Sequence, residues 1–243
     1  MKGIYWIWLS ILSVCLFCIS IQAYADERQG FVTEEMSIEE SERVLTNINL
    51  SLSNVEFSKK AIVCFDVNEQ GLVAIGTEEG EHKTVCIYSD TGNFQYGYRF
   101  ETSGSFGVEL NDEVLNIYFV RGDIIVSIDS RGEIQNVSRI CDTSENNTYW
   151  NKFVRATHRD IGNYQYVLKN DVGILGIFAS SYSQLYRIDE NGNQLLIYDA
   201  NTIQFFNMLI SFWGILLFIS IVVVAIIKEL KKLQKENANN FKY

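Results

Sequence analysis

Hydrophobic and polar positions divide the chain into a long apolar block near each end and a region of short alternating segments between them. The second block, residues 203–227, has no charged side chain in 25 positions. A helix needs about 20 apolar residues to cross the hydrocarbon core of a bilayer, whereas a surface helix of a soluble protein has a polar face. This pattern predicts a transmembrane helix over 203–227.

The first block follows Lys2 and is apolar through residues 4–21. A basic start, an apolar centre and small residues up to Ala25 are typical of a secretory signal, which predicts a signal peptide over 1–25. This apolar run is longer than the roughly 7–15 residues usual in a signal peptide, so an uncleaved anchor helix is the alternative. Either interpretation places residues 26–202 outside the cytoplasm.

The charges on the two sides of the predicted span differ in sign. The tail, residues 228–243, has five lysines and two glutamates, and positively charged flanks remain on the cytoplasmic side. Residues 26–202 hold 28 acidic and 14 basic residues, within a chain of net charge −10. We therefore expect a cell-membrane protein with an acidic outer domain, a cytoplasmic C-terminus with its lysines near the lipid bilayer, and no nucleic-acid binding.

The region between the two blocks is predicted to be rich in strands. Residues 26–58 read as an acidic arm with one half-buried strand over 45–57, where apolar and polar positions alternate. Over 59–202, short β-branched and aromatic runs are separated by Gly, Asn and Asp, and none of them sustains a helical period. The fold prediction is an all-β domain, whose last predicted strands are 164–169, 173–179, 184–189 and 194–199.

Two sequence marks recur and divide this domain into four-stranded units of about 40 residues. The first is an apolar strand that ends in Asn and an acid, at 68–69, 111–112 and 170–171. The second is a turn with Asp and Gly, at 90–92, 129–132 and 189–192. Asp accepts a backbone hydrogen bond in such a turn and Gly supplies a positive φ, whereas a calcium loop needs more oxygen ligands. We interpret the turns as corners of a repeated sheet.

Four short strands per unit, with a polar turn between the third and the fourth, resemble a β-propeller blade. The resemblance covers residues 61–199 and is greatest to the NHL-type repeats. Typical propellers have about 4–8 blades, and three units are visible here. The resemblance therefore implies an incomplete propeller-like stack of repeated meanders. The alternatives are a degenerate fourth blade that includes 45–57, or a sandwich of similar meanders.

Residues 141–163 form a polar insertion between the second and third units, and this insertion contains Tyr149, Trp150 and Phe153. Long loops on a rigid scaffold often carry binding residues, so these three aromatic residues are the candidate ligand or partner contacts. The alternative is that they pack as a cap over the third unit.

Sequence patterns of catalytic and metal sites are missing. His82 and His158 stand alone, and the chain has neither a Gly-x-Ser-x-Gly elbow nor a glycine-rich phosphate loop. We predict no catalytic residue, no metal ligand and no cofactor. Cys64, Cys86 and Cys141 follow the first apolar block, and they permit either one disulfide with a free thiol or three buried thiols.

The functional prediction is a membrane-anchored, surface-exposed β-repeat protein that acts as a binding or assembly module and not as an enzyme. An open stack leaves sheet faces and edges to cover, which favours a protein partner or self-association. The alternatives are a surface receptor for a small ligand or carbohydrate at 141–163, and a membrane-tethered enzyme for which no residue can be nominated.

Overall fold

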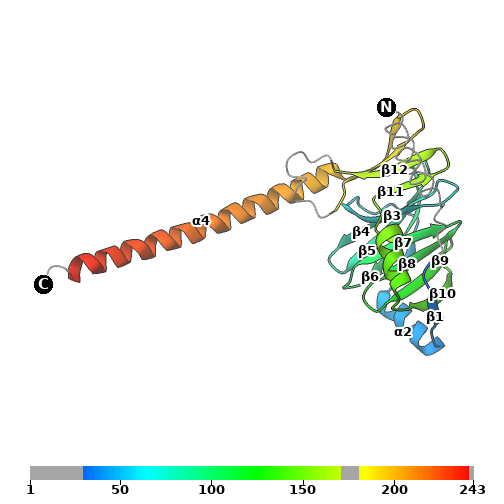
Figure 1. Cartoon of the computed structure of the whole chain (residues 1–243), viewed down its shortest axis with the longest axis horizontal. Coiled ribbons are helices and arrows are strands. Elements are labelled where there is room, and N and C mark those ends of the chain that lie inside the picture. Colours follow the sequence, from blue (N-terminus) through cyan, green and yellow to red (C-terminus); the bar gives the residue numbers. More distant parts are fainter. Residues whose placement is uncertain (1–29, 171–180, 241–243) are drawn as a thin grey trace, which may run out of the picture. The chain divides into compact units, whose positions relative to one another are not determined.

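The computed structural model describes residues 30–170 and 181–240, and these form three antiparallel sheets, short helices and one long C-terminal helix (Figure 1). The predicted signal peptide or anchor over 1–25 lies outside the described residues. The all-β prediction is confirmed in part: the domain is mostly β, and each sheet is built on an antiparallel meander of four consecutive strands, but short helices accompany them. Within the described residues the sheets close into neither a barrel nor a propeller.

The first two sheets each have a fifth strand that comes from the N-terminal segment. The first sheet has the order β2-β6-β5-β4-β3, with strands β2 (Ser51–Ser53), β3 (Ile62–Val67), β4 (Val73–Glu79), β5 (His82–Tyr88) and β6 (Phe94–Glu101). The second has the order β1-β10-β9-β8-β7, with strands β1 (Thr33–Glu35), β7 (Phe106–Asn111), β8 (Val114–Phe119), β9 (Ile124–Asp129) and β10 (Ile134–Ile140).

The third sheet has four strands and departs from the predicted strand set. Its members are β11 (His158–Ile161), β12 (Tyr164–Lys169), β13 (Gln184–Ile188) and β14 (Gln194–Asp199). Strand β12 pairs directly with β13, and the first strand lies in the segment expected to be an insertion. The predicted strand 173–179 lies outside the described residues. Asn170 therefore follows the second strand of its sheet, whereas Asn68 follows the first, so the first sequence mark is not equivalent in all three units.

The N-terminal segment holds a helix that covers part of the predicted acidic arm and the start of the predicted strand. Helix α2 (Ile38–Ile48) includes the start of 45–57, and only Ser51–Ser53 of that range is a strand. The helix begins at a capping box, in which the Ser37 side chain accepts a hydrogen bond from the Glu40 backbone and the Glu40 side chain accepts one from the Ser37 backbone. The strand predicted over 45–57 is therefore confirmed only at Ser51–Ser53, and the capping box at Ser37 begins the helix that precedes it.

The hydrophobic core lies on both faces of the first sheet. One cluster joins this sheet to the second sheet and includes Val85, Phe100 and Ile117. Another cluster joins it to the third sheet and includes Phe65 and Leu185. A third cluster covers the opposite face of the second sheet with the insertion, which contains helices α3 (Ser144–Tyr149) and η1 (Trp150–Val154). Trp150 and Phe153 thus pack against the core, as the alternative interpretation expected, but on the second sheet and not on the third.

Helix α4 (Asn201–Asn240) follows the third sheet with only Ala200 between it and β14. Residues Asn201–Lys228 are long and apolar enough to cross a membrane, since an 18-residue window within them has a mean hydropathy of 2.9 and none of that window is buried by the rest of the protein. This helix agrees with the apolar segment predicted over 203–227. A surface of this kind is compatible with membrane anchoring.

Candidate functional site at the insertion

The insertion folds locally because its sequence begins with a helix cap. Thr143 precedes α3, and its hydroxyl oxygen accepts a hydrogen bond from the backbone N–H of Asn146 over 3.1 Å. The chain then widens into one turn of π-helix, which closes with a hydrogen bond from Arg155 N–H to the Trp150 carbonyl at 3.1 Å. Such π turns occur frequently at functional sites, so the side chains around Trp150 form the candidate site.

A glycine lets this π turn approach β7, the edge strand of the second sheet opposite β1. A Cβ atom on Gly107 of β7 would lie 2.2 Å from Val154 Cγ1 and 3.1 Å from the Trp150 ring. A side chain at position 107 would therefore push the π turn away from the sheet.

The three predicted contact residues lie together, and they contact an aromatic residue of the N-terminal segment. Tyr149 is buried, while Trp150 and Phe153 are partly buried against the same cluster. The ring of Phe31 lies 4.8 Å from the ring of Tyr149, 4.7 Å from that of Tyr118 and 6.2 Å from that of Trp150, measured between centroids. The Tyr149 and Phe153 rings are 4.9 Å apart. We call Tyr118, Tyr149 and Trp150 the aromatic cage.

Beside the cage, Asn146 binds the backbone of the residue after Phe31 on both of its polar atoms. Its side-chain oxygen accepts a hydrogen bond from Val32 N–H, and its side-chain nitrogen donates one to the Val32 carbonyl, both at 2.8 Å. The Cys141 N–H donates a further hydrogen bond to that carbonyl at 3.0 Å. Asn146 is itself buried, and its side-chain nitrogen also donates a hydrogen bond to the Cys141 carbonyl at 2.7 Å, so its amide is held in one orientation.

A buried glutamate fixes two rings of the cage. Glu109 on β7 is 6% exposed and accepts hydrogen bonds from the hydroxyls of Tyr118 and Tyr149, the latter at 2.5 Å. Burial, together with the nearby Glu109 carboxylate, raises the pKa of Tyr118 well above its ordinary value. The Tyr118 hydroxyl therefore stays protonated, and the hydrogen bonds that both hydroxyls donate to Glu109 orient the two rings towards Phe31.

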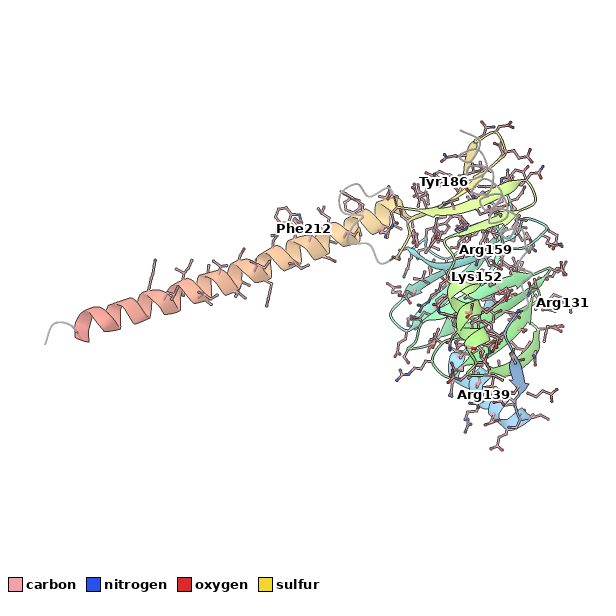
Figure 2. The ribbon with its side chains drawn as sticks, viewed as in Figure 1. Arg131, Arg139, Lys152, Arg159, Tyr186 and Phe212 are labelled. Atoms are coloured by element: carbon pink, nitrogen blue, oxygen red, sulfur yellow. The ribbon has the colours of Figure 1, made fainter. Side chains whose placement is uncertain are left out.

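An ion pair connects the π turn to the other two sheets. Arg159 Nε on β11 lies 2.7 Å from Asp66 Oδ1 on β3, and both side chains are buried (Figure 2). Asp66 also accepts a hydrogen bond from Leu110 N–H of β7, and Arg159 donates one to the Phe153 carbonyl at 2.5 Å. A paired charge buried at the junction of three sheets and the π turn specifies how they meet.

Sequence reasoning missed six of these residues, which are Phe31, Asp66, Glu109, Tyr118, Asn146 and Arg159. For Glu109 a signal was present, because a charge interrupts the apolar strand 106–110. A buried charge in a strand requires a partner, and that partner comes from a distant part of the chain. Asn146 and Phe31 carry no local signal, since each looks like an ordinary residue of a polar segment.

The recurring turns are scaffold, although their alignment needs a correction. In the three turns, one oxygen of Ser89, Asp129 or Asp189 accepts backbone N–H groups two and four residues later, at 2.8–3.3 Å. Ser89, rather than Asp90, is thus the equivalent of the two aspartates. Asp90 instead pairs with Arg187 of β13 at 2.7 Å and joins the first and third sheets.

The cysteines of the described residues are free thiols, and they lie apart from one another. Cys64 and Cys86 belong to separate core clusters on opposite faces of the first sheet, and both thiols are free, as is that of Cys141. Burial raises the pKa of Cys64 and of Cys86, which keeps both thiols protonated. No group of three or more His, Cys, Asp or Glu side chains that could hold a metal ion occurs in the described part of the chain.

A shallow polar hollow lies on the first sheet beside the core. Its lining includes Lys60, Glu79, His82 and Arg99. Lys60 pairs with Glu79, and His82 Nδ1 lies 3.4 Å from a carboxylate oxygen of Glu101. The charges of the hollow are therefore largely matched within the protein, and they are not arranged around a nucleophile.

Comparison with known proteins adds no relative. No family model, no curated protein and no solved structure matches this chain.

Proposed function

We propose that this chain is a single-pass membrane protein whose β domain is a binding or assembly module outside the cytoplasm. The apolar α4 helix supports the anchor, and the five lysines after residue 227 support a cytoplasmic C-terminus. The acidic composition of the domain supports exposure to water. The partner in this proposal is a second membrane protein.

The observation that carries the proposal is the outer edge of the third sheet. In the first two sheets, the edge strand farthest from the junction of the sheets is β2 or β1, and each of these strands is only three residues long. Strand β14 has six residues and no strand beyond it in the described chain, and its Leu195 and Leu196 are 38% and 40% exposed. Proteins usually keep exposed edge strands short or charged, because a longer apolar edge pairs with other chains.

This edge lies next to the predicted membrane anchor, since α4 begins after Ala200. Residues Ala200 and Gln204 fix the connection, through hydrogen bonds from Ala200 N–H to the Ser183 carbonyl at 2.8 Å and from Gln204 Nε2 to the Ser181 carbonyl at 2.9 Å. A partner that shares the membrane would meet β14 at a defined height above the bilayer. We therefore expect the partner to add an extended, apolar strand to β14.

Site-specific photo-crosslinking in the native membrane tests the proposal. A photoreactive amino acid replaces Leu196 in the full-length chain, and a matched variant carries it at Thr33, which is exposed on the short edge strand β1. We expect one discrete cross-linked protein from position 196 and none of that mass from position 33. The same weak, diffuse products from both positions would contradict the proposal.

A further inference from the structure

The site around Asn146 has the features of a peptide-recognition site with its ligand in place. Proteins that bind extended peptides use main-chain hydrogen bonds for affinity and a side-chain pocket for specificity. Here residues 31–35 supply both halves, since Asn146 and Cys141 bind the Val32 backbone and the aromatic cage surrounds Phe31. We infer that the aromatic cage, Asn146 and the edge of β10 form a binding site for an extended peptide of a partner protein, and that residues 31–35 are its resident, displaceable occupant.

The contacts define the chemistry of the peptide. Thr33, Glu34 and Glu35 pair with Ile140, Arg139 and Ser138 as an antiparallel strand, so the ligand is extended over five residues. Its first position is aromatic and its second is unrestricted, because Val32 is 53% exposed. A carboxylate occupies the fourth position, where Glu34 lies 3.7 Å from Arg139 (Figure 2). The recognised sequence is an aromatic residue, two variable residues and an acid.

The resident segment is held by the Phe31 ring, by the hydrogen bonds of Val32 and by a short strand pairing, and a competing peptide can replace each of these contacts. All three side chains of β1 are exposed, so Phe31 supplies most of its apolar anchoring. The chain after it is anchored independently, because α2 begins at the Ser37 cap and buries Ile48 in another cluster. Residues 31–35 can therefore leave the edge of β10 while α2 stays folded, as a local opening of low cost.

The occupied site also explains why the predicted contact residues look like core residues. Tyr149 and Trp150 pack against Phe31, and the orientation of Tyr149 is set by its hydrogen bond to the buried Glu109 rather than by Phe31. The Tyr118 hydroxyl is bound to the same carboxylate. The cage is thus preorganised by the second sheet, and it keeps its geometry when the occupant leaves.

Peptide binding to the full-length protein in detergent tests this inference. The Phe31→Ala variant weakens the resident occupant, and the probe is a labelled, acetylated peptide with the sequence of residues 31–36. The matched control peptide carries Ala in place of its Phe. We expect Phe31→Ala protein to bind the Phe peptide at least about tenfold more tightly than the Ala peptide, since burial of one aromatic ring is worth that much or more.

Two comparisons complete the design. Wild-type protein should bind the Phe peptide at least about tenfold more weakly than Phe31→Ala protein, because its tethered segment competes. Phe31→Ala combined with Asn146→Asp should bind neither peptide, because a carboxylate cannot donate to a backbone carbonyl. In the Phe31→Ala protein, residues 31–35 of one molecule cannot fill the aromatic cage of another molecule, because the Phe31 ring is missing. Such exchange therefore does not compete with the labelled peptide.

A second measurement on the wild type keeps the test decisive if the variant folds poorly. Saturating Phe peptide should accelerate hydrogen exchange at the amides of Val32 and Glu34, which face Asn146 and β10, while exchange in β9 stays unchanged. Equal affinity of a folded Phe31→Ala protein for both peptides would overturn the inference. Unchanged exchange at Val32 in the wild type, at peptide concentrations far above those that saturate the variant, would also overturn it.

Discussion

At the scale of single residues, the same turn geometry is built with different chemistry. Ser89, Asp129 and Asp189 each accept two backbone N–H groups of their own turn, but only the aspartates carry a charge. The pKa of Asp189 is lowered by hydrogen bonds from the side chain and backbone of Asn193, and that of Asp129 is lowered by the Glu133 backbone and by Arg131. The Ser89 hydroxyl accepts the same two backbone hydrogen bonds, and its ability to do so does not depend on pH.

A pH-dependent stability difference follows. The folded pKa of Asp189 lies below its unfolded value, so its stabilising effect is fully present above the unfolded pKa and is lost as the pH falls through the folded pKa. We expect Asp189→Ala to destabilise the protein at neutral pH and progressively less on acidification below about pH 4. Chemical denaturation across this range measures the difference.

Ser89→Ala is the matched control, because it removes the same two turn hydrogen bonds without removing a charge. The loss of unfolding free energy caused by Ser89→Ala should be the same at about pH 7 and at about pH 3. If the Asp189→Ala effect were equally constant over these pH values, the carboxylate would not be the titrating group in its turn.

At the scale of elements, the sheets are joined by buried polar contacts as well as by the core. The ion pair between Arg159 on β11 and Asp66 on β3 is the one expected to affect stability most, because both charged side chains are buried. Removal of one partner leaves the other charged and buried, which costs much more than loss of an exposed pair.

The expected cost of Arg159→Leu is therefore about 3–5 kcal/mol of unfolding free energy. Arg131→Leu is the matched control, since Arg131 pairs with Asp129 and Glu133 from an exposed position and should lose about 1 kcal/mol or less. Urea unfolding of the two variants checks the difference. Equal losses would show that the Asp66 carboxylate is satisfied without Arg159.

Elements with a local signal were predictable, and elements whose identity depends on distant partners were not. The Gly turns, the meander strands and the apolar 203–227 helix follow from patterns within about ten or twenty residues. Strand β11 has only the short pattern His158–Ile161 and forms by pairing with β12. Helix α2 was missed because most of it lies in the acidic segment that was interpreted as an arm, where the Ser-x-x-Glu pattern at Ser37 and Glu40 is the local signal of a helix start.

The candidate site shows the same limit. Tyr149, Trp150 and Phe153 were identified because aromatic residues stand out in a polar insertion. Their neighbour Phe31 lies more than a hundred positions away, and no periodicity connects the two segments. The structure supplies that contact, which changes the interpretation of the aromatic residues from an open loop to an occupied cage.

At the scale of the whole molecule, the insertion changes where a partner is expected. The open-stack argument assumed uncovered faces at both ends, but α3, η1 and Phe31 cover the outer face of the second sheet. In the third sheet, Leu195 and Leu196 remain exposed on the edge strand that precedes the apolar helix. Assembly is therefore expected at the third sheet and the membrane, with peptide binding as a separate activity of the second sheet.

The most direct test of this account is the mass of the protein purified in mild detergent from its native membrane. The account predicts a stoichiometric complex with a second membrane protein, and a Leu195→Lys, Leu196→Lys variant should lose this partner while it keeps the thermal stability of the wild type, because both side chains are exposed. A wild-type protein that is recovered as a lone, folded monomer would contradict the assigned role in assembly.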